Sequence, residues 1–315
     1  MDLQFYTLDV FTSTRLEGNP LAVVRVPSGL GAKLSQETKQ KIAQEFNLSE
    51  TVFLHEGDDD EAHRERRVDI FTTDSEIPFA GHPTIGTAFL VRNHLRHASV
   101  DTLVARAGPI SLQSDGADGR IRAGIPHDVH LHARTLADVV RPDDPRLSSD
   151  PAIREAVLGA PIFSIVNGMT FVLARLPSLD VLGRVAKTQL DLSQLRDALL
   201  DEGWRAGFMG CYYYVDVGDG GGEEQGRRLR TRMVELSLED PATGSAASAL
   251  SAYLTLKEEK RGRKFEITQG VEMGRRSVIS VETTMKSSED KVESLWLGGT
   301  AVVVMSGSLR VDATS

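Results

Sequence analysis

The hydrophobic pattern of the N-terminal part is that of short strands separated by turns. Leu3–Thr12 and Leu21–Val26 are apolar and β-branched, and the turn-forming sequence Glu17-Gly18-Asn19-Pro20 lies between them. Runs of this length and composition predict β-strands. The helical spacing of apolar residues over 35–46 predicts one helix after them. Further strands are predicted at Thr51–His55 and Val68–Thr72.

The second half of the chain again favours strands. The stretch 130–150 carries prolines and many charges, which predicts a boundary loop, and a leucine-rich helix is predicted over 190–200. The acidic segment 56–61 and the glycine-rich segment 218–222 predict solvated hairpin tips. Strands are predicted at Phe163–Val166, Thr170–Ala174, Tyr212–Val217 and Leu229–Ser237, and over most of 265–311.

An internal repeat is the most informative feature of the pattern. Glu76-Ile77-Pro78-Phe79-Ala80-Gly81 and Glu239-Asp240-Pro241-Ala242-Thr243-Gly244 lie 163 positions apart and share Glu, Pro and Gly. Each copy follows a predicted strand and precedes a segment that is apolar nearly all round, which predicts a buried helix. His82 and Ser245 stand where N-caps are expected. The repeat therefore predicts two duplicated domains.

The two predicted helix N-termini indicate an anion site. Each presents unpaired backbone N–H groups and a partial positive charge of roughly half a unit. Gly81 and Gly244 allow a ligand to approach the backbone closely. If the two domains face each other, both N-termini can bind one small carboxylate in the cleft between them.

Several side chains near these turns have both a functional and a structural interpretation. Glu50, just before a strand, is either a surface residue or a general acid/base whose pKa is raised by burial. His82 either caps its helix or moves a proton. Asp240 either caps the second helix, orients His82 or binds a substrate amine, and Ser245 is either a cap or a carboxylate ligand. Asn19 is a further candidate for substrate binding, with Gly81 and Gly244.

Metal chemistry is not expected. His127, His130 and His132 have the spacing H-x-x-H-x-H in a predicted loop, where solvent-exposed histidines are the favoured interpretation. A metal site would require further ligands nearby. The prediction is therefore that no metal is bound.

Composition narrows the class of protein. The chain has 315 residues and a net charge of −9, which favours two domains and excludes broad wrapping around nucleic acid. No run of about 18 apolar residues is present, so no membrane span is expected. Cys211 is the only cysteine, which excludes an internal disulfide and favours a cytoplasmic location.

Five stretches together resemble the PhzF-like family of phenazine-biosynthesis isomerases. They occur in the family's order and span nearly the whole chain; beside them, Gly270 and Gly274 match the family's turn near the end. The stretches are D-V-F-T at Asp9–Thr12, G-N-P-L-A-V-V at Gly18–Val24, S-E-T-V-F at Ser49–Phe53, P-F-A-G-H-P-T-I-G-T-A at Pro78–Ala88 and E-D-P-A-T-G-S-A at Glu239–Ala246.

The resemblance implies an α+β, diaminopimelate-epimerase-like fold. Two pseudo-symmetric domains would each wrap a mostly antiparallel β-sheet around a central α-helix. The expected domains are 1–125, with a returning strand at about 306–315, and 126–305, with the active site in the cleft between them. A homodimer is also implied.

The implied reaction is a proton shift without a cofactor on a small carboxylate-bearing metabolite resembling trans-2,3-dihydro-3-hydroxyanthranilate. The family's acid/base glutamate matches Glu50, and its active-site histidine, aspartate and serine match His82, Asp240 and Ser245. Racemising relatives have a cysteine before each turn glycine, where this chain has Ala80 and Thr243. A non-catalytic binding or scaffold protein and an epimerase of a cyclic amino acid remain the alternatives.

Overall fold

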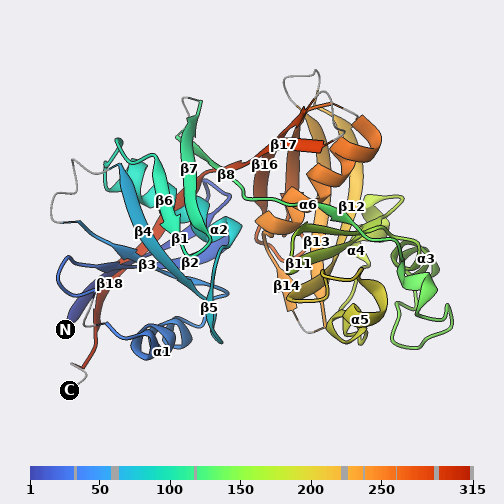
Figure 1. Ribbon diagram of the computed structural model, residues 1–315, viewed down its shortest axis with the longest axis horizontal. Helices are drawn as coiled ribbons and strands as arrows, with labels where there is room; N and C mark the ends of the chain where they lie inside the picture. The colour runs from blue at the N-terminus through green and yellow to red at the C-terminus, as the bar shows by residue number, and fades with distance from the viewer. Residues whose placement is uncertain are drawn as a thin grey trace. The chain divides into compact units, whose positions relative to one another are not determined.

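The computed structural model describes residues 1–31, 34–57, 64–116, 119–220, 226–236, 238–259, 261–286 and 291–312. The chain forms two compact units, one of residues 1–124 with 297–315 and one of residues 125–296 (Figure 1). Most of the acidic segment 56–61 and part of the glycine-rich segment 218–222 lie outside the described residues. Among the helices described, none has the length and apolar character needed to cross a membrane.

The first unit is a mostly antiparallel sheet with two α-helices. Strand β1 pairs antiparallel with β2 and β18, β2 pairs parallel with β3, and β3 pairs antiparallel with β4. Strand β4 pairs antiparallel with β5 and parallel with β6, after which β6, β7 and β8 are antiparallel. The elements are β1 (Asp2–Val10), β2 (Asn19–Val26), α1 (Gln36–Phe46), β3 (Thr51–His55), β4 (Glu65–Phe71), β5 (Glu76–Ile77), α2 (Gly81–Phe89), the π-helix η1 (Leu90–His94), β6 (Thr102–Ala105), β7 (Gly108–Asp115), β8 (Arg120–Gly124) and β18 (Ala301–Arg310).

The second unit repeats this order of pairings. Strands β10 and β11 are antiparallel, β11 and β12 are parallel, and β12 and β13 are antiparallel. Strand β13 pairs antiparallel with the short β14 and parallel with β15, which is followed by antiparallel β16. The correspondence of β4-β5-α2-η1-β6 with β13-β14-α6-η4-β15 confirms the duplication expected from the sequence.

The second unit also has elements outside the repeat, among them α3, α4 and the short helices η3 and α5. Its elements in chain order are β9 (His130–Leu131), the 3₁₀ helix η2 (Leu136–Asp138), α3 (Pro151–Leu158), β10 (Ile162–Val166), β11 (Met169–Arg175), α4 (Leu179–Gly183), the 3₁₀ helix η3 (Leu192–Leu195), α5 (Arg196–Leu199), β12 (Phe208–Asp219), β13 (Arg227–Glu235), β14 (Leu238–Asp240), α6 (Gly244–Leu254), the π-helix η4 (Thr255–Glu259), β15 (Arg263–Gln269), β16 (Ser277–Lys286) and β17 (Lys291–Gly299), which leads into β18.

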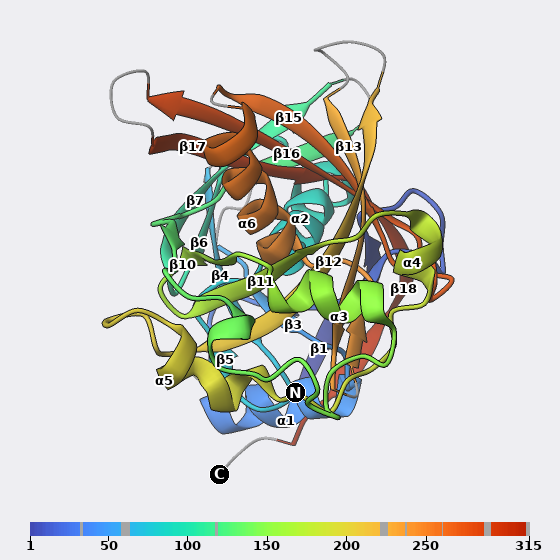
Figure 2. The same cartoon turned by 90° about the vertical axis from the view of Figure 1, so that its right-hand side faces the viewer.

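Each unit has one buried helix packed directly against its strands. Helix α2 contacts β1, β2, β3 and β8, and all its residues up to Ala88 are buried. A Cβ atom on Gly86 would lie 2.6 Å from a methyl group of Leu21, so glycine permits this close approach. Helix α6 is rich in alanine and serine, and it contacts β10, β11 and β16 (Figure 2). Small side chains therefore bring both helices close to the sheet.

The predicted starts of the two buried helices were wrong by one or two residues. Gly81 and Gly244 are themselves helical, and the N-cap residues are Ala80 and Thr243, neither of which makes a side-chain capping bond. His82 and Ser245 are thus the second helical residues and not caps. The turn before each helix ends at Ala80 or Thr243, so Gly81 and Gly244 are the first helical residues.

Other predicted elements were confirmed with shifted ends. The helix over 35–46 begins after Ser35, whose hydroxyl oxygen accepts the Thr38 N–H at 3.1 Å, and the strand Thr51–His55 is β3. The single helix predicted over 190–200 was wrong, because the chain forms the 3₁₀ helix η3 followed by the one-turn helix α5.

A buried ion pair ties α1 to the sheet of the first unit. The Lys39 ammonium lies 2.5 Å from Asp69 Oδ2, and each side chain is only 5% exposed. His55 Nε2 lies 2.7 Å from the same oxygen. Hydrogen bonds from His55 and Lys39 outweigh the effect of burial, so the pKa of Asp69 is lowered. Loss of Lys39 would leave the Asp69 carboxylate in the core with only His55 and Arg67 as partners among the described side chains.

We expect Lys39→Ala to destabilise the first unit by about 1.5–3 kcal/mol, since it removes one charged hydrogen bond from the buried Asp69 carboxylate while His55 still binds it. Hydrogen-exchange mass spectrometry of peptides covering α1 and β3 measures this local effect. The matched control is Lys41→Ala, because Lys41 pairs with Glu37 on the exposed face of the same helix. Equal protection in both variants would contradict the prediction.

Candidate active site

Glu50 is a largely buried carboxyl group at the start of a central strand of the first unit's sheet. It directly precedes β3, and its side chain is 18% exposed. Its Oε2 atom is buried and has no hydrogen-bond partner among the described residues. Burial raises the pKa of Glu50, and a hydrogen bond from the Ser49 side chain only partly opposes this shift. The interpretation as an ordinary surface residue is therefore wrong.

His82 and Asn19 lie beside this carboxyl group. His82 Nδ1 is 3.6 Å from Glu50 Oε2 and 3.5 Å from Asn19 Nδ2, and both His82 and Asn19 are buried. Parallel strands β2 and β3 begin at the same end of the sheet, with Asn19 and Glu50 at their starts, and the first turn of α2 supplies His82, which contacts both. Because the amide nitrogen of Asn19 is a donor, it favours the His82 tautomer with its proton on Nε2.

The second unit places its candidate residues on the turn between β14 and α6. The Thr243 hydroxyl donates to Asp240 Oδ2 at 2.5 Å, which explains why this good capping residue does not cap its helix. Ser245 is half-buried in the first turn of α6. Asp240, Gly244 and Ser245 are thus gathered at one helix N-terminus, as Gly81 and His82 are at the other.

Three buried polar residues behind this turn were missed by the sequence analysis. Gln269, at the end of β15, bonds to Thr243 and to the Asp240 backbone, while Tyr212 lies 2.9 Å from both Gln269 and Thr231. The one available signal was the glycine after Gln269. Gly270 has a φ of +76°, and a Cβ there would lie 2.7 Å from the Pro241 carbonyl oxygen. The Gly270 turn can be predicted from the sequence, but it does not show which way the Gln269 side chain before it points.

The histidine-rich segment of the second unit is a hydrogen-bonded cluster. Among the described residues, His130, His132 and Asp201 bring potential ligand atoms within 4.8 Å of one another. The lone pair of His132 Nδ1 already accepts the Asp201 backbone N–H at 3.1 Å, and His130 Nε2 lies 2.7 Å from Asp201 Oδ2. His127 is outside the group and faces the Ile125 and Val292 carbonyls.

The expectation that these histidines are exposed was wrong for His132. Its Nε2 lies 2.9 Å from the Ser164 hydroxyl, which lies 2.6 Å from the Thr170 hydroxyl, so the whole imidazole is satisfied inside the unit. Burial lowers the pKa of His132 to about 4, with His130 adding to the effect and Asp201 opposing it.

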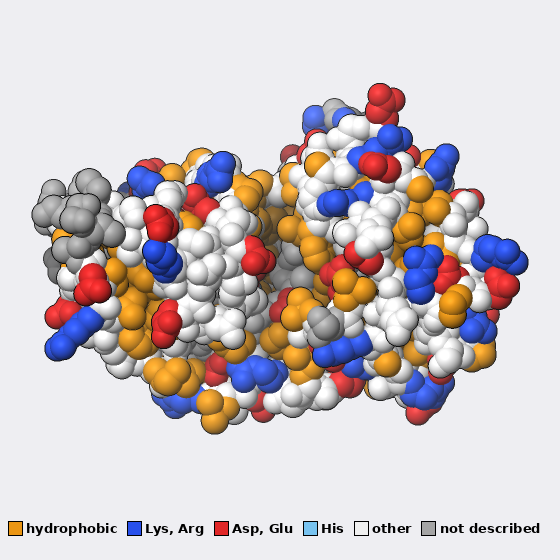
Figure 3. Space-filling model, turned by 90° about the horizontal axis from the view of Figure 1, so that it is seen from below, with side chains coloured by type: hydrophobic (Ala, Val, Ile, Leu, Met, Phe, Trp, Pro, Cys, Tyr) orange, Lys and Arg blue, Asp and Glu red, His pale blue; other side chains and the backbone are white. Residues whose placement is uncertain are grey.

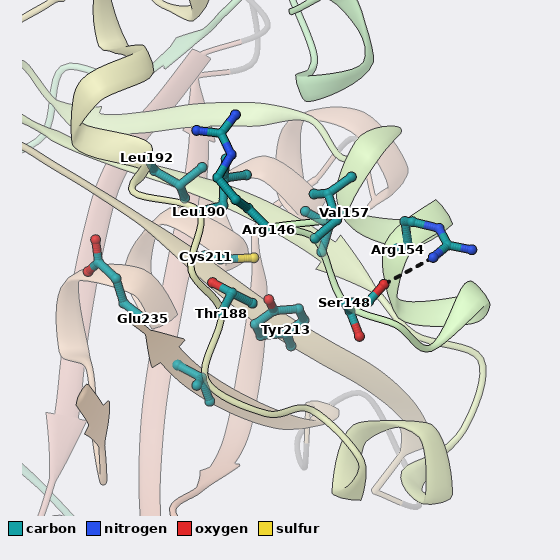
Figure 4. Close-up of a pocket in the computed structure, with 12 residues that line it drawn as sticks. Arg146, Ser148, Arg154, Val157, Thr188, Leu190, Leu192, Cys211, Tyr213 and Glu235 are labelled. Atoms are coloured by element: carbon teal, nitrogen blue, oxygen red, sulfur yellow. Dashed lines mark hydrogen bonds between the residues drawn. The ribbon is translucent and has the colours of Figure 1, made fainter. Parts of the chain in front are cut away.

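A small cavity of about 20 Å³ lies elsewhere in the second unit and has room for about one water molecule (Figure 4). Cys211, Tyr213 and Glu235 line it, but none of the candidate residues does. Burial raises the pKa of Cys211 to about 12 and that of Glu235 to about 7. A thiol with so high a pKa is a poor nucleophile or base at neutral pH.

Charges on the surface are mixed in sign. On the face shown in Figure 3, acidic and basic side chains are interspersed within each unit and do not gather into one basic area. This agrees with the net charge of −9 and with a ligand that is held by a few placed groups.

Comparison with known proteins identifies the class. An uncharacterised isomerase of Mesorhizobium japonicum is 32% identical over 320 residues, covering 96% of this chain and 97% of the relative. The trans-2,3-dihydro-3-hydroxyanthranilate isomerase of Pseudomonas fluorescens is 31% identical over 282 residues, covering 87% of this chain and 88% of the relative. The fold and its named relatives thus define an isomerase with a diaminopimelate-epimerase-like fold.

The family model described as phenazine biosynthesis-like protein matches residues 8–156 and 231–307. The chain belongs to this family, PhzC-PhzF, as its motifs suggested. The fold is also that of the Bacillus anthracis phenazine biosynthesis protein of the PhzF family, with a TM-score of 0.72, 21% identity and coverage of 99% of this chain and all of that one.

The raised pKa of Glu50 has a consequence for stability. Because the folded state binds a proton more tightly than the unfolded chain, folding stability decreases as the pH rises above about 4.5, the ordinary pKa of a glutamate, towards the raised pKa of the folded state. We expect Glu50→Gln to raise the melting temperature at pH 7 and to leave it nearly unchanged at pH 4. Calorimetry at both values tests this, with the exposed Glu45→Gln as control.

His132 predicts the opposite pH dependence in the second unit. Its folded pKa is about 4 and its ordinary value is 6.5, so the unfolded chain binds the extra proton and stability is lost as the pH falls between these values. We expect a loss of about 3 kcal/mol that is absent in His132→Asn. Trp204, stacked on His130 at 4.6 Å, provides a fluorescence signal. The same pH slope in both proteins would contradict the assignment.

Proposed function

We propose that this isomerase moves a proton within a small carboxylate-bearing metabolite resembling trans-2,3-dihydro-3-hydroxyanthranilate, with Glu50 as the general acid/base. The observation that carries the proposal is the buried Glu50 Oε2, which has no hydrogen-bond partner among the described residues and faces His82. A carboxyl group that only stabilised the fold would be expected to have its oxygens hydrogen-bonded.

The chemistry needs one group that first accepts and then returns a proton. The Glu50 carboxylate removes a proton from a carbon atom, and the C–H electron pair becomes part of a shifted double bond. The same proton is then returned to another carbon on the same face. No electrons are lost or gained overall, so the step requires no redox cofactor.

We assign substrate binding to the residues at the N-termini of α2 and α6. The backbone N–H groups at Gly81 and Gly244 would hold the substrate carboxylate or the developing negative charge. His82 and Asn19 would orient the ring next to Glu50, while Asp240 and Ser245 would hold its polar substituents.

The residues next to the turn glycines disfavour two-base epimerisation. Ala80 has no titratable side chain, and the Thr243 hydroxyl donates to Asp240. Neither position offers a second base for inversion at a carbon centre. A proton transfer in which Glu50 alone takes the proton from one carbon and returns it to another is therefore the better-supported mechanism.

The cellular setting is part of the proposal. A cytoplasmic location is supported by the single, buried cysteine. The homodimer is carried over from the family resemblance, and light scattering of the purified protein measures it directly.

The decisive experiment is solvent deuterium incorporation. The protein is incubated in D₂O with trans-2,3-dihydro-3-hydroxyanthranilate and with a panel of cyclic amino and hydroxy acids, and mass spectrometry records exchange and isomer formation. We expect Glu50→Gln to lower the rate about 10²- to 10⁴-fold, because the acid/base group is lost, while calorimetry shows retained binding.

Glu45→Gln is the matched control, since Glu45 is exposed on α1. Full activity of Glu50→Gln would exclude Glu50 as the acid/base. Products of inverted configuration would instead favour an epimerase. Binding of a protein partner with no turnover of any tested compound would favour a scaffold role.

A further inference from the structure

The side chain of Gln269 is the centre of a buried network behind the Asp240–Gly244 turn. The residue ends β15 and is fully buried. Its Oε1 accepts from the Thr243 N–H at 3.2 Å and from the Tyr212 hydroxyl at 2.9 Å. Its Nε2 donates to the Asp240 carbonyl at 2.7 Å and to the Thr243 hydroxyl oxygen at 3.0 Å. Two acceptor and two donor positions of the amide are thus used.

The backbone fixes which way this amide points. The Thr243 N–H can only donate and the Asp240 carbonyl can only accept, so the oxygen of Gln269 must face the first and the nitrogen the second. A carboxylate in the same place would put an oxygen against the Asp240 carbonyl. Glutamine is therefore the side chain that this turn requires.

The amide also determines the direction of the next hydrogen bond. Since the Thr243 hydroxyl oxygen accepts from Gln269 Nε2, its proton is available for Asp240 Oδ2, which lies 2.5 Å away. The order Gln269 to Thr243 to Asp240 is a relay that holds the carboxylate in one orientation. Such connected bonds in a buried site support one another.

A separate ion pair holds the other side of the same turn. Arg232 binds Glu239 with two nitrogens at 2.7 and 2.9 Å, and it donates to the Leu182 and Val185 carbonyls. In the first unit the corresponding glutamate, Glu76, instead accepts from Gln36 at the surface. The second turn is thus anchored from two sides by buried groups.

We infer that Gln269 is a positioning residue for the reaction, which fixes Asp240 and the N-terminus of α6 through Thr243. The inference rests on the proposed function, because it assigns the fixed carboxylate to substrate binding. Gln269 does not touch the substrate itself. Its hydrogen bonds to Thr243 and to the Asp240 backbone hold the turn in one conformation, and this keeps the Asp240 carboxylate in place.

Thr243→Val and Thr243→Ser test the relay, because valine has the shape of threonine without the hydroxyl and serine keeps the hydroxyl. In the deuterium assay we expect kcat to fall about 10- to 100-fold in Thr243→Val and to stay within about threefold of wild type in Thr243→Ser. Thr268→Val is the control, since Thr268 precedes Gln269 on β15 and its side chain points to the other face.

Gln269→Glu gives a second, independent readout. A protonated carboxyl group can donate to the Asp240 carbonyl, whereas the carboxylate cannot. We therefore expect the kcat of this variant, relative to wild type at each pH, to recover as the pH is lowered, while circular dichroism shows a constant folded fraction. The double variant with Thr243→Val should lose no more activity than the more severely affected single variant.

The outcomes separate this inference from the proposed function. If Glu50→Gln is inactive but Thr243→Val and Gln269→Glu are as active as wild type, the positioning role is overturned and the function stands. A flat ratio of variant to wild-type kcat across pH would also overturn the role. If the wild type shows no exchange that depends on Glu50, the proposed function fails and the inference fails with it.

Discussion

The close packing of one small-residue helix against the sheet of each unit is the constraint on which the rest of the structure depends. Helices α2 and α6 have almost no exposed face, many of their side chains are small, and Gly86 leaves no room for a Cβ beside Leu21. A helix in this position must begin at a tight turn at the edge of the sheet. The glycine that ends each turn thereby leaves a helix N-terminus whose N-cap side chain makes no capping bond. The geometry that completes the core thus also creates the anion-binding potential.

The two copies of this arrangement have acquired different chemistry. In the first unit, a histidine in the first turn of the helix faces a carboxyl group at the start of β3, and Asn19 completes the group. In the second unit, the turn itself carries the carboxylate, and a threonine hydroxyl bonds to it. The first copy offers a titratable pair, whereas the second offers a fixed carboxylate. The duplicated turn therefore carries different polar groups in the two units.

Sequence patterns correctly predicted the elements that depend on residues close together in the chain. The helix after Ser35, the strand Thr51–His55 and the duplicated turns follow from spacing, capping and motif, and all are present. The burial of His132 and the bonds of Gln269 were not predictable, because they depend on which strands become neighbours. The starts of the buried helices were misplaced because capping side chains were expected at His82 and Ser245, whereas the N-caps are Ala80, which has no polar side chain, and Thr243, whose hydroxyl donates to Asp240.

A raised pKa suits the double task proposed for Glu50. A group that removes a proton must be ionised in the first step, and the same group must be a competent acid in the second. A carboxyl group at its ordinary pKa is a weak base at neutral pH, so its protonated form would be rare and the removal of a C–H proton slow. Burial shifts the balance towards the protonated form and brings the pKa nearer to the working pH, where both steps are served. Under the proposed function, the desolvation that costs the fold some stability at Glu50 is also what would let a single carboxyl group serve both steps.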